Sequence, residues 1–155
     1  MRIDGSATLE IQATPAECVA ALLDLASYTA WYPGVTTAEV VDPGGPQPTA
    51  RLVFTTGMPI LAEIECVLQI DQPTPNRVRA VTLSDGVQID GDGWILDGPA
   101  EGPTTATYAI GVEMKVPGGP FVEHLVKAKA GEFLIDRPVA ALKRHVERPP
   151  DSGAR

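Results

Sequence analysis

The side chains that could do acid–base chemistry are few and lie far apart in the sequence. Glu132 falls on an otherwise apolar stripe of a helical segment near the C-terminus, and Tyr108 falls on the apolar face of a strand-like segment. A carboxylic acid or a phenol in an apolar surrounding can hold or release a proton, because burial shifts its pKa. Glu132 and Tyr108 are therefore the two candidates for catalysis. The alternative for Glu132 is a solvated carboxylate beside Lys129.

The remaining polar candidates fit no catalytic or metal-binding pattern. His124 and His145 are the only histidines, and their spacing matches no metal site, so we expect both at the surface. Asp90 and Asp92 flank a glycine in the strand-like segment Gly91-Asp92-Gly93-Trp94, which indicates exposed carboxylates at a bulge rather than an acid–base pair. The sequence has no nucleophile elbow, phosphate-binding glycine loop or dinucleotide fingerprint. We predict no metal and no cofactor.

Charge and composition exclude several classes of partner. Twelve Lys and Arg against 20 Asp and Glu give a net charge of −8, and this field repels phosphate backbones, so we expect no nucleic-acid partner. No apolar run reaches the roughly 18 residues needed to cross a bilayer, and Met1-Arg2-Ile3-Asp4 does not begin a signal peptide. We expect a cytoplasmic protein without stable membrane insertion. Cys18 and Cys66 lie in different predicted elements and are expected in the core.

The sequence predicts one domain over residues 1–148, which positions these side chains. We expect the tail at 149–155 to be disordered. The sequence has 15 Gly and 15 Pro, which indicates many turns and favours an antiparallel sheet. Thr14 and Glu17 form a capping-box pattern, so short helices are predicted at 15–24 and 25–31. Alternation predicts strands at 7–13, 35–42, 49–57, 60–71, 76–84, 87–97 and 104–116.

The hydrophobic period changes after Pro117-Gly118-Gly119-Pro120, and side chains spaced three or four residues apart then predict one long helix. Pro138 lacks a backbone donor, so we expect a kink or break over 134–138. Small residues at 128–131 either leave room against the sheet or let a bulky strand residue approach closely. The predicted inward stripe is Phe121, Leu125, Ala128, Glu132, Ile135, Val139, Leu142 and Val146.

The order of one strand, two short helices, six strands and a long helix resembles the helix-grip superfamily, which includes START lipid-transfer domains, the birch-pollen allergen family and polyketide cyclase/dehydrase-like proteins. The resemblance covers roughly residues 6–147. Its local carriers are Ala13-Thr14-Pro15-Ala16-Glu17, Leu22-Leu23-Asp24, Tyr28-Thr29-Ala30-Trp31-Tyr32-Pro33-Gly34-Val35, Gly93-Trp94-Ile95-Leu96, Thr104-Thr105-Ala106-Thr107-Tyr108, and Ala141-Leu142-Lys143-Arg144 followed by Glu147.

The resemblance implies an α+β helix-grip fold: a seven-stranded curved antiparallel sheet wrapped around the long C-terminal helix, with two short helices after the first strand. It also implies a deep cavity between sheet and helix, which different members use for lipids, sterols, polyketides, quinones or plant hormones. Two departures stand out. Pro138 interrupts the gripping helix, and no catalytic residue of a cyclase can be matched to a position here.

We therefore expect a bacterial binding protein, monomeric or homodimeric, that holds a small hydrophobic molecule such as a lipid, polyketide or quinone. We expect Trp31 to pack inward, with Tyr28 or Tyr32 near the entrance. The predicted lining is Trp31, Phe54, Ile64, Cys66, Leu68, Tyr108, Ile110, Leu125, Ala128 and Glu132. Two alternatives remain: an aromatase/cyclase-type enzyme in which Glu132 and Tyr108 move protons, and a regulatory or interaction module with a vestigial cavity.

Overall fold

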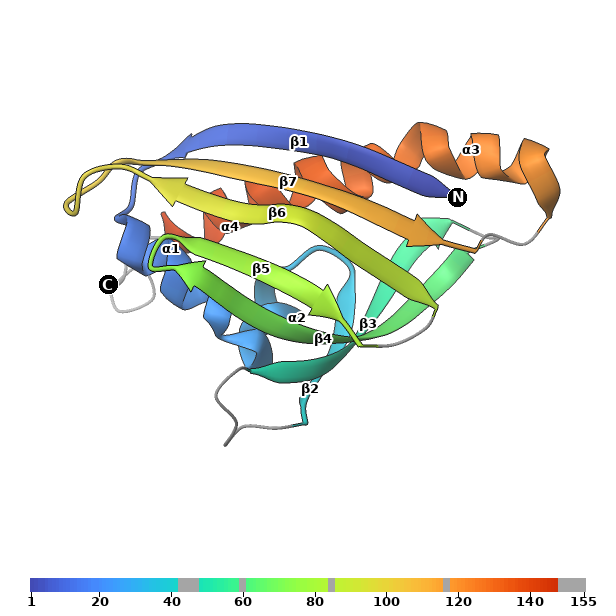
Figure 1. Ribbon diagram of the computed structural model, residues 1–155, viewed down its shortest axis with the longest axis horizontal. Helices are drawn as coiled ribbons and strands as arrows, with labels where there is room; N and C mark the ends of the chain where they lie inside the picture. Colours follow the sequence, from blue (N-terminus) through green and yellow to red (C-terminus); the bar gives the residue numbers. More distant parts are fainter. Residues whose placement is uncertain (42–47, 59–60, 84–85, 116–117, 148–155) are drawn as a thin grey trace, which may run out of the picture.

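A curved antiparallel sheet packs against helices on one side, as the sequence predicts (Figure 1). The computed structural model describes residues 1–41, 48–58, 61–83, 86–115 and 118–147, without the side chains of 56–58 and 61–62. The sheet has seven strands in the order β1-β7-β6-β5-β4-β3-β2. The predicted tail at 149–155 lies outside the described residues. The strands are β1 (Arg2–Ile11), β2 (Val35–Val40), β3 (Thr49–Met58), β4 (Leu61–Thr74), β5 (Arg77–Thr82), β6 (Val87–Asp97) and β7 (Thr104–Met114).

The first strand begins earlier than predicted, at Arg2 rather than at Ala7. It is an edge strand that pairs with β7 along its whole length, from Arg2 opposite Glu113 to Ile11 opposite Thr104. Most of its side chains are exposed, so the apolar alternation that marks a half-buried strand is absent from its first half. The first half of β1 is therefore a strand because it pairs with the well-buried β7, and not because of its own sequence pattern.

The predicted helix after β1 is confirmed as α1 (Pro15–Leu23), and both hydrogen bonds of the capping box form. The backbone amide of Glu17 donates to the Thr14 hydroxyl at 3.1 Å, and the amide of Thr14 donates to the Glu17 carboxylate at 3.0 Å. These bonds satisfy two donors that a helix start leaves open. A 3₁₀ turn, η1 (Leu25–Ser27), and the short helix α2 (Tyr28–Trp31) follow and deliver the chain to β2.

The long C-terminal helix is interrupted near the place that Pro138 predicts. An α-helix, α3 (Gly119–Gly131), runs into a π-helical turn, η2 (Glu132–Asp136), and a second α-helix, α4 (Arg137–Val146), follows. Pro138 falls in the first turn of α4, where a missing amide costs little. A π turn holds about one residue more than an α turn, so it shifts the face that all preceding residues present.

This shift makes the predicted stripe wrong in its first half. Val126 and Ala130 are the buried residues of α3, whereas Phe121 is 74% exposed and Leu125 is 50% exposed. The second half of the stripe is confirmed, since Ile135, Val139 and Leu142 are buried. The prediction assumes α-helical steps of three and four residues throughout. Across the π-helical turn, residues on the same face are five apart, so every earlier position is assigned to the wrong face.

The predicted bulge at Gly91-Asp92-Gly93-Trp94 is confirmed, because the pairing of β6 with β7 shifts between Asp90 and Gly93. On its other side, β6 pairs with β5 at Arg77 opposite Ile95 and at Val78 opposite Trp94. Beyond this point the two strands diverge, and the amide of Ile89 donates to the Thr82 hydroxyl at 3.0 Å instead of to a strand carbonyl. The sheet is therefore open beside the bulge.

Replacing Gly93 with alanine is expected to lower the free energy of unfolding by about 2 kcal/mol. Gly93 has a φ of +73°, and a Cβ atom there would lie 2.5 Å from the carbonyl oxygen of Val78. Urea unfolding measures the change. Gly131→Ala is the matched control: its Cβ meets nothing within 4 Å, so the helix should gain about 0.5 kcal/mol. Equal stability of Gly93→Ala and wild type would contradict the close backbone approach.

Candidate functional site

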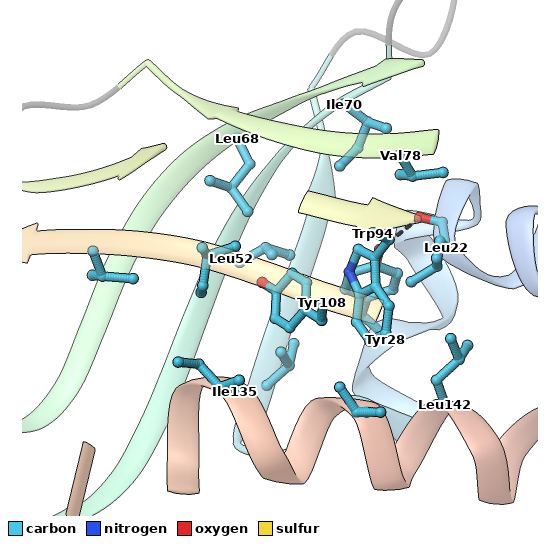
Figure 2. Packing of buried hydrophobic residues seen from close by; sticks show 14 of the residues in the cluster. Leu22, Tyr28, Leu52, Leu68, Ile70, Val78, Trp94, Tyr108, Ile135 and Leu142 are labelled. Atoms are coloured by element: carbon cyan, nitrogen blue, oxygen red, sulfur yellow. Dashed lines mark hydrogen bonds between the residues drawn. The ribbon is translucent and has the colours of Figure 1, made fainter. Parts of the chain in front are cut away.

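The concave face of the sheet and the C-terminal helices enclose a cavity of about 70 Å³. Figure 2 shows its setting: Trp94 and Tyr108 lie between the strands and the helix, which presents Ile135 and Leu142 from the opposite side. The rings of Trp94 and Tyr108 are stacked, with centroids 4.2 Å apart and planes inclined by 15°. The lining is mostly aliphatic and aromatic, which is the usual character of small-molecule sites.

Six of the residues proposed from sequence as ligand contacts line this cavity: Phe54, Ile64, Cys66, Leu68, Tyr108 and Ile110. They come from three strands, β3, β4 and β7. Residues two apart on a strand share a face, and that face is concave in this sheet. The structure therefore brings together every sheet residue of the predicted set.

The other four residues of the predicted set lie elsewhere. Leu125, Ala128 and Glu132 are exposed, because the π turn places these positions of the C-terminal helix away from the sheet. The Glu132 carboxylate lies 3.4 Å from the Arg137 guanidinium, and its side chain is 65% exposed. This is the solvated alternative for Glu132, although its partner is Arg137 and not Lys129.

The aromatic cluster after η1 is arranged differently from the prediction. Tyr28 and Tyr32 line the cavity, and Trp31 faces a groove on the surface. Tyr28 and Tyr32 are four residues apart and stack at 5.0 Å, so they share one side of the α2 turn. Trp31 points to another side, where its ring stacks on His145 with centroids 5.1 Å apart. Trp31 is partly buried against the hydrophobic core, but it lines the groove and not the cavity.

Several cavity residues are missing from the predicted lining, although Tyr28 or Tyr32 was expected near the entrance. Tyr28 and Tyr32 could have been found from their helical spacing, and Trp94 from its place beside the bulge, where alternation resumes. Phe133 and Pro138 carry no comparable signal. They lie in and just after the π turn, where a periodic stripe predicts the wrong face.

Besides Arg79 and Asp90, the titratable side chains among the described lining residues are tyrosine hydroxyls and a thiol, which carry no charge near neutral pH. Burial raises the pKa of Tyr28, Tyr32 and Tyr108. The Tyr28 hydroxyl donates to the carbonyl oxygen of Leu22 at 2.6 Å, and the hydroxyls of Tyr32 and Tyr108 are near enough for each to influence the pKa of the other. Burial also raises the pKa of Cys66 to about 12. The cavity can therefore offer hydrogen bonds to a ligand, but it holds no preformed thiolate or phenolate.

Of the described residues that line the cavity, Asp90 is the sole carboxylate, and it forms an ion pair with Arg2 of the edge strand β1. Its oxygen lies 2.7 Å from the Arg2 guanidinium, which lowers the pKa of Asp90. Asp90 and Arg79 reach the cavity where β5 and β6 diverge. The pair predicted for proton transfer is not assembled, since Glu132 is exposed and Tyr108 is enclosed.

Residues 2–147 match the family described as polyketide cyclase / dehydrase and lipid transport. The chain belongs to this family. The match spans the sheet and every described helix, so the family covers the cavity as a whole. Membership gives a START-like ligand-binding fold and leaves the ligand open. No curated protein sequence matches the chain.

Solved structures of similar fold include a START superfamily protein and an aromatase/cyclase. A protein from Thermus thermophilus is 18% identical with a TM-score of 0.76, over 93% of this chain and 97% of that one. A START superfamily protein from Mycobacterium smegmatis is 19% identical with a TM-score of 0.68, over 94% and 97%. The Zhui aromatase/cyclase from Streptomyces sp. R1128 is 16% identical with a TM-score of 0.69, over 96% and 95%. At these identities the likeness shows the fold alone.

The residues that the structure describes contain neither a membrane-spanning helix nor a cluster of metal ligands. None of the helices there is long and apolar enough to cross a bilayer. Across the same ranges, no three His, Cys, Asp or Glu side chains gather as metal ligands would.

Proposed function

We propose that the protein binds a small hydrophobic molecule in the cavity between the sheet and the C-terminal helices. The observation that carries this proposal is an apolar space kept open in a protein interior, where side chains ordinarily pack at crystal-like density. Removing apolar ligand surface from water supplies roughly 25 cal/mol per Å². The proposed contacts are the six predicted sheet residues, with Tyr32 and Trp94 added from the structure.

The hydroxyls of Tyr32 and Tyr108 are proposed to orient the ligand. They lie near each other in a largely apolar space, so either hydroxyl can donate a hydrogen bond to a ligand carbonyl or hydroxyl. The free volume of about 70 Å³ is enough for only a few water molecules. A lipid, polyketide or quinone therefore requires Tyr32, Phe133 or their segments to move outward.

An aromatase/cyclase-type reaction is the second candidate, and the enclosed pair of tyrosine hydroxyls favours it. Tyr108 is neutral, so it can donate a hydrogen bond to a ketone oxygen on which negative charge develops. Glu132 takes no part, because it is exposed. Turnover of a poly-ketone chain by wild type, lost in Tyr108→Phe with the substrate still bound, would support this candidate over simple carriage.

Binding is tested on the purified full chain in two ways. Native mass spectrometry followed by solvent extraction is expected to reveal a copurified apolar molecule. Titration with the uncharged fluorescent probe N-phenyl-1-naphthylamine is expected to give one saturable site with a Kd on the order of 1 µM. A protein that is always empty and takes up no probe would overturn the proposal and favour an interaction module. The cytoplasmic location and the monomeric or homodimeric state remain predictions.

A further inference from the structure

We propose that the groove between α2 and α4 binds an acidic end group of the cargo, so that the preferred ligand is an amphipathic carboxylate or phosphate with an apolar body. This inference rests on the proposed function and adds the class of ligand. The groove has a volume of about 620 Å³. It is lined by Ala30, Trp31, Pro33, Arg137, Ala141, Arg144 and His145.

The groove gathers cations on one helix face. Arg137, Ala141 and Arg144 follow one another by four and three residues on α4, so they share a side of the helix, with the small Ala141 between the two arginines. Among the described residues, none of those that line the groove is an Asp or Glu. The chain as a whole has a net charge of −8, so two arginines in one concave surface give this groove a local charge opposite to that of the rest of the molecule.

Neither guanidinium is held firmly by the protein. Arg137 lies 3.4 Å from the Glu132 carboxylate, and both side chains are more than half exposed, so this pair is weak. Within the described part of the chain, the Arg144 side chain forms no ion pair or hydrogen bond. Glu147 is engaged elsewhere, by Lys143 at 2.7 Å and by the amide of Gln12 at 2.6 Å. An incoming anion therefore has little to displace.

The groove and the apolar cavity share a wall. Pro33 lines both spaces. On each side of the wall, neighbouring residues face opposite ways: Trp31 lines the groove and Tyr32 the cavity, while Arg137 lines the groove and Pro138 the cavity. The helices that carry them, α2 and α4, contact each other. A molecule whose apolar body fills the cavity can therefore reach the guanidiniums with a short polar end that passes beside Pro33.

The chemistry of the groove selects an oxyanion. A guanidinium can hold a carboxylate or a phosphate through two parallel hydrogen bonds, which an alcohol or an uncharged ester cannot match. The stacked rings of Trp31 and His145 form a flat boundary beside these groups. The carboxylate and the phosphate monoester are two sources of the same chemistry, and the experiment separates them.

The test compares ligands of one chain length by displacement of N-phenyl-1-naphthylamine from the full-length protein: decanoate, decyl phosphate and 1-decanol. Wild type is expected to bind at least one of the two anions about tenfold more tightly than the alcohol. In the double variant Arg137→Gln, Arg144→Gln, that preference is expected to fall below about twofold, while the affinity for 1-decanol and for the probe is unchanged.

The control is the double variant Arg51→Gln, Lys127→Gln, which removes the same charge at exposed positions outside the groove. It is expected to keep the preference for the anion. Equal binding of the anions and the alcohol by wild type, or equal loss in both double variants, would overturn the inference and leave the hydrophobic site standing. Failure of the uncharged probe to bind wild type would instead overturn the proposed function and the inference with it.

Discussion

Leu142→Ala is expected to lower the free energy of unfolding by about 3 kcal/mol. Leu142 is 0% exposed and lies in the main hydrophobic cluster, on the helix α4 that contacts α1, β1 and β7. Truncation removes buried methyl groups and leaves a hole that the surrounding β-sheet can close only in part. Urea unfolding at constant m-value gives the change.

Leu125→Ala is the matched control, because it makes the same chemical change on the same long helix. Leu125 is 50% exposed, so its loss is expected to cost less than about 0.5 kcal/mol. The pair also tests the π turn, since the uninterrupted periodic stripe places both leucines inside. Similar losses for the two variants would mean that α3 presents Leu125 to the sheet, contrary to the structure.

Cys66→Phe is expected to weaken binding of N-phenyl-1-naphthylamine at least tenfold. Cys66 lies on the concave side of β4 with 2% exposure and lines the cavity, so a phenyl ring there takes the space that the proposed ligand needs. Some strain is expected as well, about 1 kcal/mol, because the ring must fit between packed neighbours. Fluorescence titration measures the affinity, and urea unfolding measures the strain.

Two further variants separate filling from loss of the thiol. Cys66→Val keeps a small side chain and is expected to bind the probe as wild type does. Val67→Phe places the same ring on the neighbouring residue of β4, whose side chain points to the other face, and is expected to leave affinity unchanged. Full affinity in Cys66→Phe would show that the probe binds outside the cavity.

The sheet and its concave face follow from features that are local in sequence. Alternation on β4 places Ile64, Cys66 and Leu68 on one side, and β7 does the same for Tyr108 and Ile110. The capping box at Thr14 fixes the start of α1 without help from the rest of the molecule. The order from β2 to β7 was accessible because short turns join most neighbours, whereas the pairing of β1 with β7 is not local in sequence.

The cavity's helical wall could not be obtained in this way, because it depends on how the helix meets the sheet. A prediction from three- and four-residue spacing does not allow for the extra residue of a π turn. It therefore predicts Leu125 and Ala128 to be buried, whereas Val126 and Ala130 are the buried residues. Trp31 is misplaced for a related reason: a single turn of helix has no repeat to show which of its aromatic residues faces inward.

The π turn at Glu132–Asp136 also bears on how residue roles are transferred between relatives. At identities below 20%, an ungapped alignment that is correct over α4 pairs every α3 position with the wrong neighbour when the relative has an uninterrupted helix there. A gap of one residue within 132–136 restores the match. Substrate contacts assigned to the front half of this helix by ungapped homology would otherwise land on solvent-facing side chains.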